Sequence, residues 1–182
     1  MADVALDACC LINLLAAGRI LDPAFRGPAL GLTLHVPQKA VEETLYLLKP
    51  DADGASVLVK AEIDLGPCFA AGLVHRCAIE GPAESDLFVR LAVWLDDGEA
   101  ECLAIARQRG WLMATDDRPA RRLARDLGVD VLSTAEVVKR WAERTGAADE
   151  LIRQVLGNIE TYARFTPRRN SPEYSWWMSK LP

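Results

Sequence analysis

The chain has 182 residues, of which 51% are hydrophobic and 26% are charged, and its formal net charge at pH 7 is -5. This length and balance are typical of one globular domain and exclude an intrinsically disordered chain. The negative net charge argues against a protein that coats nucleic acid with a generally basic surface, but it leaves room for a local basic patch or a metal-dependent enzyme.

The cysteines and the apolar runs indicate a cytoplasmic protein. The five cysteines lack the CxxC spacing of zinc sites, and we interpret them as small buried residues in a reducing cytosol; we expect the adjacent Cys9 and Cys10 to point in different directions. The apolar stretch at residues 8–17 contains Asn13 and follows Asp7, which is not typical of a signal peptide. The apolar runs are shorter than the ~20 residues of a membrane span, so no membrane contact is expected.

The first half of the chain begins with a predicted strand, turn and helix. Residues 4–6 form a short apolar strand, and residues 8–18 have helical periodicity that stops at a glycine. A second helix is predicted over "HVPQKAVEETLYLL" (35–48), which has a proline near its start and apolar residues at helical spacing. Residues 56–65 and 72–81 have β-like or mixed patterns.

The second half alternates helices with short apolar strands. We expect strands at 111–115 and 129–133, and helices at 82–95, 98–110, 118–128, 134–146 and 148–165. This alternation predicts an α/β fold, a three-layer α/β/α sandwich with a mainly parallel central sheet. We expect one domain over residues 1–145, followed by a C-terminal helix and tail over 146–182 that pack on the same domain or on a partner. The arginine- and aromatic-rich tail from about 166 is interpreted as an extension rather than a core element.

Acidic residues follow the predicted strands or begin the helices after them. In an open α/β sheet functional groups collect beyond the carboxyl ends of the strands, so these acids are expected at one edge: Asp7, Glu42, Glu43, Glu99, Asp116 and Asp117. Clustered carboxylates raise each other's pKa values unless a cation neutralises them. A ligand set made only of oxygen atoms favours Mg²⁺ or Mn²⁺ over zinc.

Each acid also has a structural explanation, because Asp and Glu favour helix N-termini. Asp96 with Glu99 resembles a capping box, and Asp116 is a candidate cap for the helix at 118–128. Other chemistries fit less well. Cys9 occupies the position where haloacid-dehalogenase phosphatases need a second Asp, phosphate-cradling glycine loops are absent, and His35 and His75 lie near no nucleophile motif.

Four segments in order resemble the PIN-domain family, metal-dependent nucleases that include the VapC-type toxins of toxin–antitoxin pairs. These segments are "VALDACCLINLLAAGRI", "VPQKAVEETLYLL", "DDGEAECLAIARQRG" and "LMATDDRPARRLARDLGVDVLST", and the resemblance covers roughly residues 3–140. The residues at 1–145 would accordingly form a PIN-like nuclease domain. The resemblance implies a Mg²⁺- or Mn²⁺-dependent endoribonuclease that hydrolyses RNA phosphodiester bonds, with no covalent protein intermediate.

The resemblance also implies which residues form the site. The catalytic acids would be Asp7, Glu43, Glu99 and Asp117, with Asp7, Glu99 and Asp117 as the metal ligands and with Asp116, Glu101 and Glu42 as neighbouring alternatives. Thr115 and Asn13 would help to orient the site or its substrate. One departure is Ala8-Cys9, where the family commonly has Thr or Ser, which places any hydroxyl contact at that point in question.

Two basic groups are candidate RNA contacts. Arg118, Arg121, Arg122 and Arg125 fall at i, i+3, i+4 and i+7 and would share one helix face beside Asp117, either binding phosphates or forming a solvated face with local ion pairs. Arg164, Arg168 and Arg169 are interleaved with aromatic residues that would stack on bases or pack over the domain or a second subunit. An antitoxin and a second copy of the chain are the other candidate partners.

Two alternative functions remain open on the sequence. The first is a PIN-like fold that binds RNA or protein without catalysis, with its acids serving only as helix caps. The second is a metal-dependent phosphoesterase that acts on DNA or nucleotides.

Overall fold

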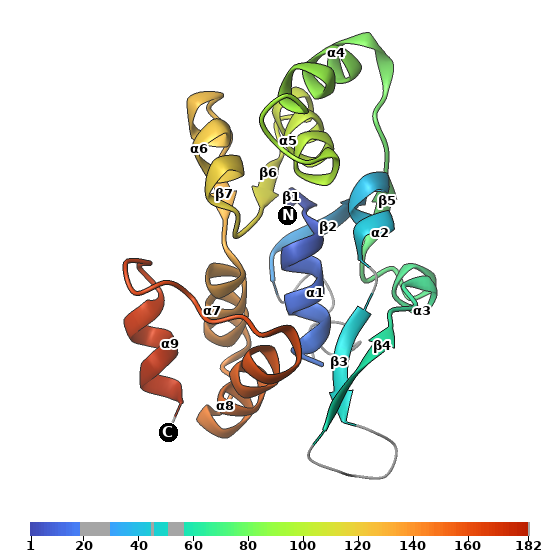
Figure 1. Cartoon of the computed structure of the whole chain (residues 1–182). Helices are drawn as coiled ribbons and strands as arrows, with labels where there is room; N and C mark the ends of the chain where they lie inside the picture. The colour runs from blue at the N-terminus through green and yellow to red at the C-terminus, as the bar shows by residue number, and fades with distance from the viewer. Residues whose placement is uncertain (19–29, 45, 51–56, 182) are drawn as a thin grey trace.

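A five-stranded parallel sheet forms the centre of the molecule (Figure 1). The computed structural model describes residues 1–18, 30–44, 46–50 and 57–181. The strand order is β5-β2-β1-β6-β7. The strands are β1 (Ala2–Leu6), β2 (Leu32–Pro37), β5 (His75–Cys77), β6 (Leu112–Ala114) and β7 (Val131–Leu132).

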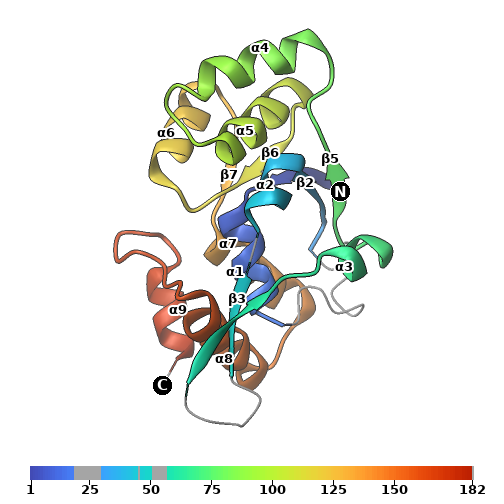
Figure 2. The ribbon, with the colours of Figure 1, turned by 45° about the vertical axis from the view of Figure 1, so that its right-hand side comes forward.

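Helices cover both faces of this sheet because successive side chains of β1 point to opposite faces. Val4 and Leu6 are fully buried in one apolar cluster, together with side chains of α1 (Ala8–Ala16), α7 (Thr134–Thr145) and α8 (Asp149–Asn158). Ala5 belongs to a second cluster, which is formed with α4 (Gly81–Leu91), α5 (Asp97–Arg109) and α6 (Arg118–Asp126). Figure 2 shows these two helical layers with the sheet between them. The predicted three-layer α/β/α fold is confirmed.

The helix predicted within residues 35–48 begins next to Pro37, as expected, but it ends earlier than expected. Residues 35–37 belong to β2, and the helix α2 is confined to Gln38–Glu43. It ends because Thr44 has φ -81° and ψ 79° and donates its hydroxyl to the Ala40 carbonyl at 2.6 Å. The chain then forms β3 (Tyr46–Pro50), which pairs antiparallel with β4 (Leu58–Glu62). Leu45, which contributed to the helical pattern, lies outside the described residues.

The two segments predicted as β-like or mixed contain short strands. β4 lies within 56–65 and β5 within 72–81, and α3 (Gly66–Ala70) connects them. No described helix is both long enough and apolar enough to cross a membrane.

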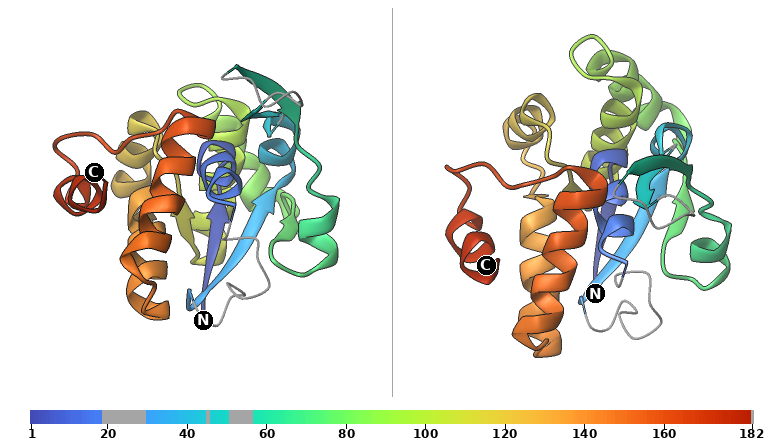
Figure 3. Two further views of the ribbon diagram at one scale, coloured as in Figure 1. Left: turned by 90° about the horizontal axis from the view of Figure 1, so that it is seen from below. Right: turned by 60° about the horizontal axis from the view of Figure 1, so that its bottom comes forward.

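The C-terminal segment is part of the core, so its interpretation as an extension is wrong. Helix α8 continues into a π-helical turn, η2 (Ile159–Ala163), and the chain then crosses to α9 (Tyr174–Lys180) (Figure 3). Trp177 of α9 is fully buried in the cluster that contains Val4, and its indole N–H donates to Glu160 at 3.0 Å. Phe165 meets the Trp177 ring edge-on at 5.8 Å between ring centroids. The aromatic residues at these two positions therefore fix the tail to the body of the protein.

Candidate active site

The carboxyl ends of the neighbouring strands β1 and β6 lie at the topological switch point of the sheet, where the order of the strands along the chain reverses. The chain runs from β1 through α1 to β2 on one side, whereas β6 lies on the other side of β1. Asp7 directly follows β1, and residues 115–117 directly follow β6. The Asp7 N–H donates to the Ala114 carbonyl at 3.0 Å, which holds the two strand ends together. Crevices at such switch points are where open α/β sheets bind ligands.

Asp7 is a buried carboxylate that accepts three hydrogen bonds. Its Oδ1 caps α1 by accepting from the Ala8 N–H at 2.8 Å, and its Oδ2 accepts from the Thr115 hydroxyl and the Cys9 thiol, each at 2.9 Å. Burial raises the pKa of Asp7, although these donors act in the opposite direction. A carboxylate has about four lone-pair sites, so Asp7 retains capacity for one further ligand.

Thr115 links Asp7 to Asp117. Its hydroxyl is fully buried, donates to Asp7 and accepts from the Asp117 N–H at 3.1 Å. Asp117 in turn caps α6, because its Oδ1 accepts from the Ala120 N–H at 2.8 Å. Its Oδ2 has no hydrogen-bond partner among the described residues. One oxygen of Asp117 thus fixes the helix start, and the other remains available to a ligand.

Glu99, in the first turn of α5, has a strongly raised pKa. Burial, followed by repulsion from Asp96, Asp117 and Asp7, raises its pKa from 4.5 to about 8. The side chain is half-buried, and Asp96 caps the helix by accepting from the Glu99 N–H at 2.9 Å. The capping interpretation of Asp96 is therefore correct, while the Glu99 carboxylate faces the other acids of the edge.

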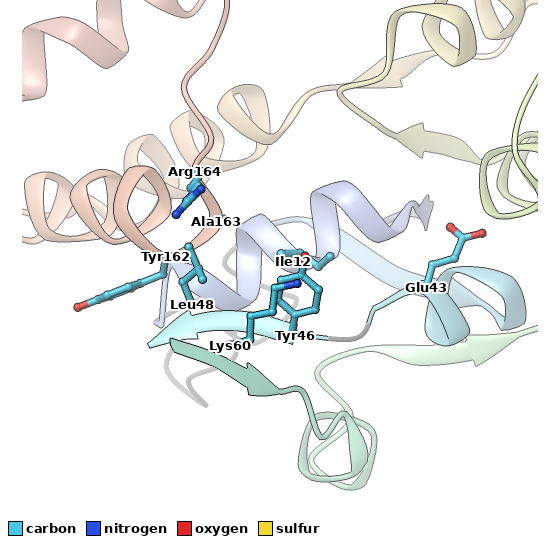
Figure 4. Close-up of a pocket in the computed structure, with 8 residues that line it drawn as sticks. All are labelled: Ile12, Glu43, Tyr46, Leu48, Lys60, Tyr162, Ala163 and Arg164. Carbon is cyan, nitrogen blue, oxygen red and sulfur yellow. The ribbon is translucent and has the colours of Figure 1, made fainter. Parts of the chain in front are cut away.

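Glu43 reaches the same edge from the end of α2. Its Oε1 accepts from the Gly98 N–H at 3.0 Å, so it binds the first turn of α5. Burial raises the pKa of Glu43, with further contributions from Asp96, Asp7 and Asp97. A Cβ atom on Gly98 would lie 2.2 Å from Glu43 Oε2, so only glycine allows this approach. In Figure 4 the Glu43 carboxylate points away from Tyr46 and Lys60.

The structure places Asp7, Glu43, Glu99 and Asp117, the four acids that the resemblance implied, at one edge of the sheet. Asp7 repels both Glu43 and Glu99, and Asp117 repels Glu99, although no three of these acids are found with oxygen atoms within 4.8 Å of one another. Each of the three Asp7, Glu43 and Glu99 has a raised pKa, and each is repelled by other carboxylates of the edge. Oxygen donors crowded in this way suit a hard divalent cation such as Mg²⁺ or Mn²⁺. Their role as metal ligands remains a prediction.

Asp116 has a different environment from its neighbour Asp117. Its Oδ2 accepts from the Thr134 hydroxyl at 2.5 Å and from Asn13 at 3.2 Å, and its Oδ1 accepts from the Thr134 N–H at 3.1 Å. Asp116 therefore connects α1 and α7 to the end of β6. The expectation that Asp116 caps α6 is wrong, because Asp117 does so. Asn13, predicted as a substrate contact, is buried and directed to Asp116 and Thr134.

The other two alternative acids also have partners elsewhere. Glu101 is buried and accepts from the Lys39 N–H at 2.6 Å, which ties α5 to the start of α2. Glu42 is exposed and lies 3.3 Å from Lys39, and the hydrogen bond from Gln38 together with Lys39 lowers its pKa. Repulsion from Asp7 and Asp117 is not among the causes that shift the pKa of either carboxylate, in contrast to Glu99.

Cys9 and Cys10 do not point in different directions as expected. Both sulfur atoms lie within 4.8 Å of each other and of an Asp116 oxygen, a grouping able in principle to hold a metal. Burial raises the pKa of Cys10 well above its usual range, which disfavours the thiolate that a metal requires. Cys9 donates to Asp7, so its thiol takes the place of the hydroxyl that the sequence lacks. The sequence signal for this role was a cysteine where the family commonly has Thr or Ser, because a thiol, like a hydroxyl, can donate a hydrogen bond.

Two hollows adjoin the acids. One, of about 540 Å³, lies between α6 and residues 164–173, and its lining includes Asp116 and the arginines Arg118, Arg121, Arg122, Arg125, Arg164 and Arg168. We call it the arginine groove. The other, of about 400 Å³, lies beside Glu43 and includes Ile12, Tyr46, Lys60 and Tyr162 (Figure 4). Arg164 lines both. Neither Gly98 nor the groove-lining role of the tail was predicted from the sequence.

Comparison with known proteins identifies the family. No curated protein and no solved structure matches the chain. A family model described as a PIN domain (DUF3368) matches residues 70–169, which is more than half of the 182-residue chain. The matched segment includes Glu99, Asp117 and the helix α6 between the site and the groove. The chain therefore belongs to the PIN-domain family, whose members are generally nucleases.

Proposed function

We propose that this protein is a Mg²⁺- or Mn²⁺-dependent endoribonuclease. The observation that supports this proposal is the mutual repulsion among Asp7, Glu43, Glu99 and Asp117 near the switch point of the sheet, where Asp7 repels Glu43 and Glu99 and Asp117 repels Glu99. Burial first, and then repulsion from neighbouring carboxylates, raises the pKa values of three of these acids, and a bound cation would favour their charged forms. A structural role for caps alone does not account for Glu99, because Asp96 is the N-cap of α5 and Glu43 accepts from the Gly98 N–H in the first turn of the same helix.

The residues divide the work of hydrolysis. Asp7, Glu99 and Asp117 would hold the ion, and Thr115 would orient the Asp7 carboxylate through its 2.9 Å hydrogen bond to Oδ2, which leaves acceptor capacity on Oδ1. When bound, the ion supplies positive charge for the phosphate oxygens and a more acidic water. Glu43 is held by the Gly98 N–H and would accept the proton that this water loses. Arg118 and Arg122, which are exposed at the start of α6, would orient the phosphodiester.

We further propose that the protein acts in the cytoplasm as the toxin of a toxin–antitoxin pair, with an antitoxin protein and a second copy of the chain as candidate partners. The support is its resemblance to VapC-type PIN domains in four ordered segments. The five free cysteines of the chain suit a reducing compartment. Arrest of growth on expression, relieved by Asp7→Asn, is the expected behaviour of such a toxin.

The test of the nuclease is cleavage of labelled RNA with Mn²⁺. We expect Asp7→Asn and Asp117→Asn each to lower the rate by about 100-fold or more, since loss of a ligand removes several kcal/mol of transition-state stabilisation. The matched control is Asp126→Asn, an exposed acid at the end of the same helix α6, which should retain full activity. Melting curves establish that each variant is folded.

The outcomes separate the alternatives. Equal activity in all variants would show that these acids are not the site. Cleavage of DNA or a nucleotide in preference to RNA in a competition assay would make the protein a different phosphoesterase. RNA binding without cleavage under Mg²⁺ or Mn²⁺ would make it a non-catalytic binding module.

A further inference from the structure

The arginine groove has a large surplus of positive charge. Six arginines and two carboxylates, Asp116 and Glu173, line it, although the whole chain has a net charge of -5. Asp116 is satisfied by Thr134, and Glu173 is buried and accepts from the Ser171 hydroxyl at 3.1 Å. The local surplus therefore opposes the overall charge of the protein, as expected of a surface that binds a polyanion.

Most of these arginines have no partner among the residues that the structure describes. Arg121 is engaged, because it donates to the Thr115 carbonyl at 3.1 Å and lies 3.7 Å from Glu136. The remaining five have no ion pair or hydrogen bond with the described residues: Arg118, Arg122, Arg125, Arg164 and Arg168. All five are exposed. The sequence left open that the arginines of α6 form local ion pairs on a solvated helix face. Apart from Arg121, they form no such ion pairs with the described residues.

The C-terminal segment forms the side of the groove opposite α6, and packing contacts fix its position. Pro167 is buried, Phe165 packs on Trp177, and Lys180 of α9 lies 2.6 Å from Asp149 of α8. Arg164 has φ 55°, the only positive φ among the described non-glycine residues. Such a conformation costs of order 1 kcal/mol or more and persists where the surrounding structure enforces it. Here it turns the chain out of η2 at the junction of the two hollows.

Resting on the proposed nuclease function, we propose that the arginine groove binds the phosphate backbone of single-stranded RNA flanking the cleavage site, with Arg164 and Arg168 as binding residues opposite α6. The groove adjoins the site along the chain, because Asp116 and Arg118, which line the groove, flank the cap residue Asp117. Its volume of about 540 Å³ suits a few nucleotides of one strand rather than a duplex, whose two backbones are separated by a wide groove. Half-buried Phe165 in the lining offers a ring edge to a base.

The test measures binding apart from cleavage. The probe is a fluorescein-labelled 16-nucleotide single-stranded RNA in EDTA, followed by anisotropy at several salt concentrations. We expect Arg164→Ala/Arg168→Ala to reduce the slope of log K against log[salt] by about 1.4, because each lost phosphate contact removes about 0.7. At 0.1 M salt that change corresponds to roughly 25-fold weaker binding.

The matched control is Arg169→Ala. Arg169 is an exposed neighbour with the same charge, but it is not part of the groove lining. It should bind RNA like the wild type, with an unchanged slope for the salt dependence. If Arg169→Ala weakened RNA binding as much as the double variant does, the loss of affinity would be explained by net charge alone, and the proposal would be overturned.

The combined results of the binding and cleavage assays distinguish a failure of this proposal from a failure of the proposed nuclease function. Unchanged RNA binding by the double variant, with cleavage still abolished by Asp7→Asn, would refute the groove and leave the nuclease intact. Salt-dependent binding that requires Arg164 and Arg168, with no cleavage under Mn²⁺, would support the groove and refute the nuclease. A poly-glutamate peptide of matched charge that competes as well as RNA would assign the groove to an acidic protein and overturn the proposal.

Discussion

The raised pKa of Glu99 predicts that a neutral side chain at this position stabilises the metal-free protein at alkaline pH. Burial and repulsion raise that pKa from 4.5 to about 8. The folded state therefore binds the Glu99 proton more tightly than the unfolded state, and stability falls as the pH rises from about 4.5 to about 8. Glu99→Gln removes this penalty, so we expect the variant to be more stable than the wild type at pH 8 and equally stable at pH 4.5.

The size of the effect follows from the degree of burial. A shift of this extent would correspond to several kcal/mol for a fully desolvated group, at about 1.4 kcal/mol for each pH unit. Glu99 is only half-buried, and water screens much of the repulsion, so we expect about 1–2 kcal/mol. For a chain of this length that difference corresponds to a Tm increase of about 2–8 °C.

The assay is thermal unfolding in EDTA at pH 4.5 and pH 8, repeated at pH 8 with Mn²⁺. The wild type should gain stability from Mn²⁺, whereas Glu99→Gln should gain much less, because one proposed ligand has been lost. Glu42→Gln is the matched control, since Glu42 is exposed and has a lowered pKa. A Glu99→Gln variant that is no more stable than wild type at pH 8 would refute the claim that burial and neighbouring carboxylates destabilise the charged form of Glu99.

Two other predictions concern the groups that position these acids. Gly98→Ala should displace Glu43, because the new Cβ would lie 2.2 Å from its Oε2, and should lower the rate of RNA cleavage with Mn²⁺ by roughly 10-fold or more, since Glu43 is the proposed proton acceptor. Gly157→Ala is its control, because a Cβ there meets no atom within 4 Å; equal cleavage rates of the Gly98 and Gly157 variants would contradict the role of Gly98. Cys9→Ser should retain RNA cleavage within about threefold, because a hydroxyl also donates to Asp7, while Cys9→Val should lose roughly 10-fold. Equal cleavage by the two Cys9 variants would show that the donor is dispensable.

The sequence predicted the fold well because apolar periodicity determines which element forms and which face is buried. The strand that contains Val4 and Leu6 and the helix that contains Glu99 are both present as predicted. The error at 35–48 has a local cause. Apolar residues at helical spacing continue past Glu43, but Thr44 leaves the helical conformation, and Leu47 is buried from a strand instead. Periodicity alone cannot separate these alternatives in so short a segment.

The choice between adjacent acids depended on contacts that no local pattern encodes. Asp116 and Asp117 are neighbours with the same chemistry and both follow β6. Thr134, 18 residues further along the chain, donates to Asp116 through both its N–H and its hydroxyl. That tertiary contact engages Asp116 and leaves Asp117 as the cap of α6 with one free oxygen. The sequence could supply both candidates, whereas the fold distinguishes between them.

In the C-terminal tail, burial of one aromatic side chain both stabilises the fold and positions the arginines of the groove. Its aromatic residues were expected either to stack on bases or to pack over the domain, and its arginines were treated with them. Trp177 is fully buried, which removes it from any surface role, but its burial anchors the segment that presents Arg164 and Arg168. The aromatic and basic residues thus have separate functions. Because a side chain that orders the segment stabilises the arginines' positions before a ligand arrives, less conformational entropy would be lost when that ligand binds. On this argument, loss of the Trp177 side chain would weaken RNA binding without removing any charge from the groove.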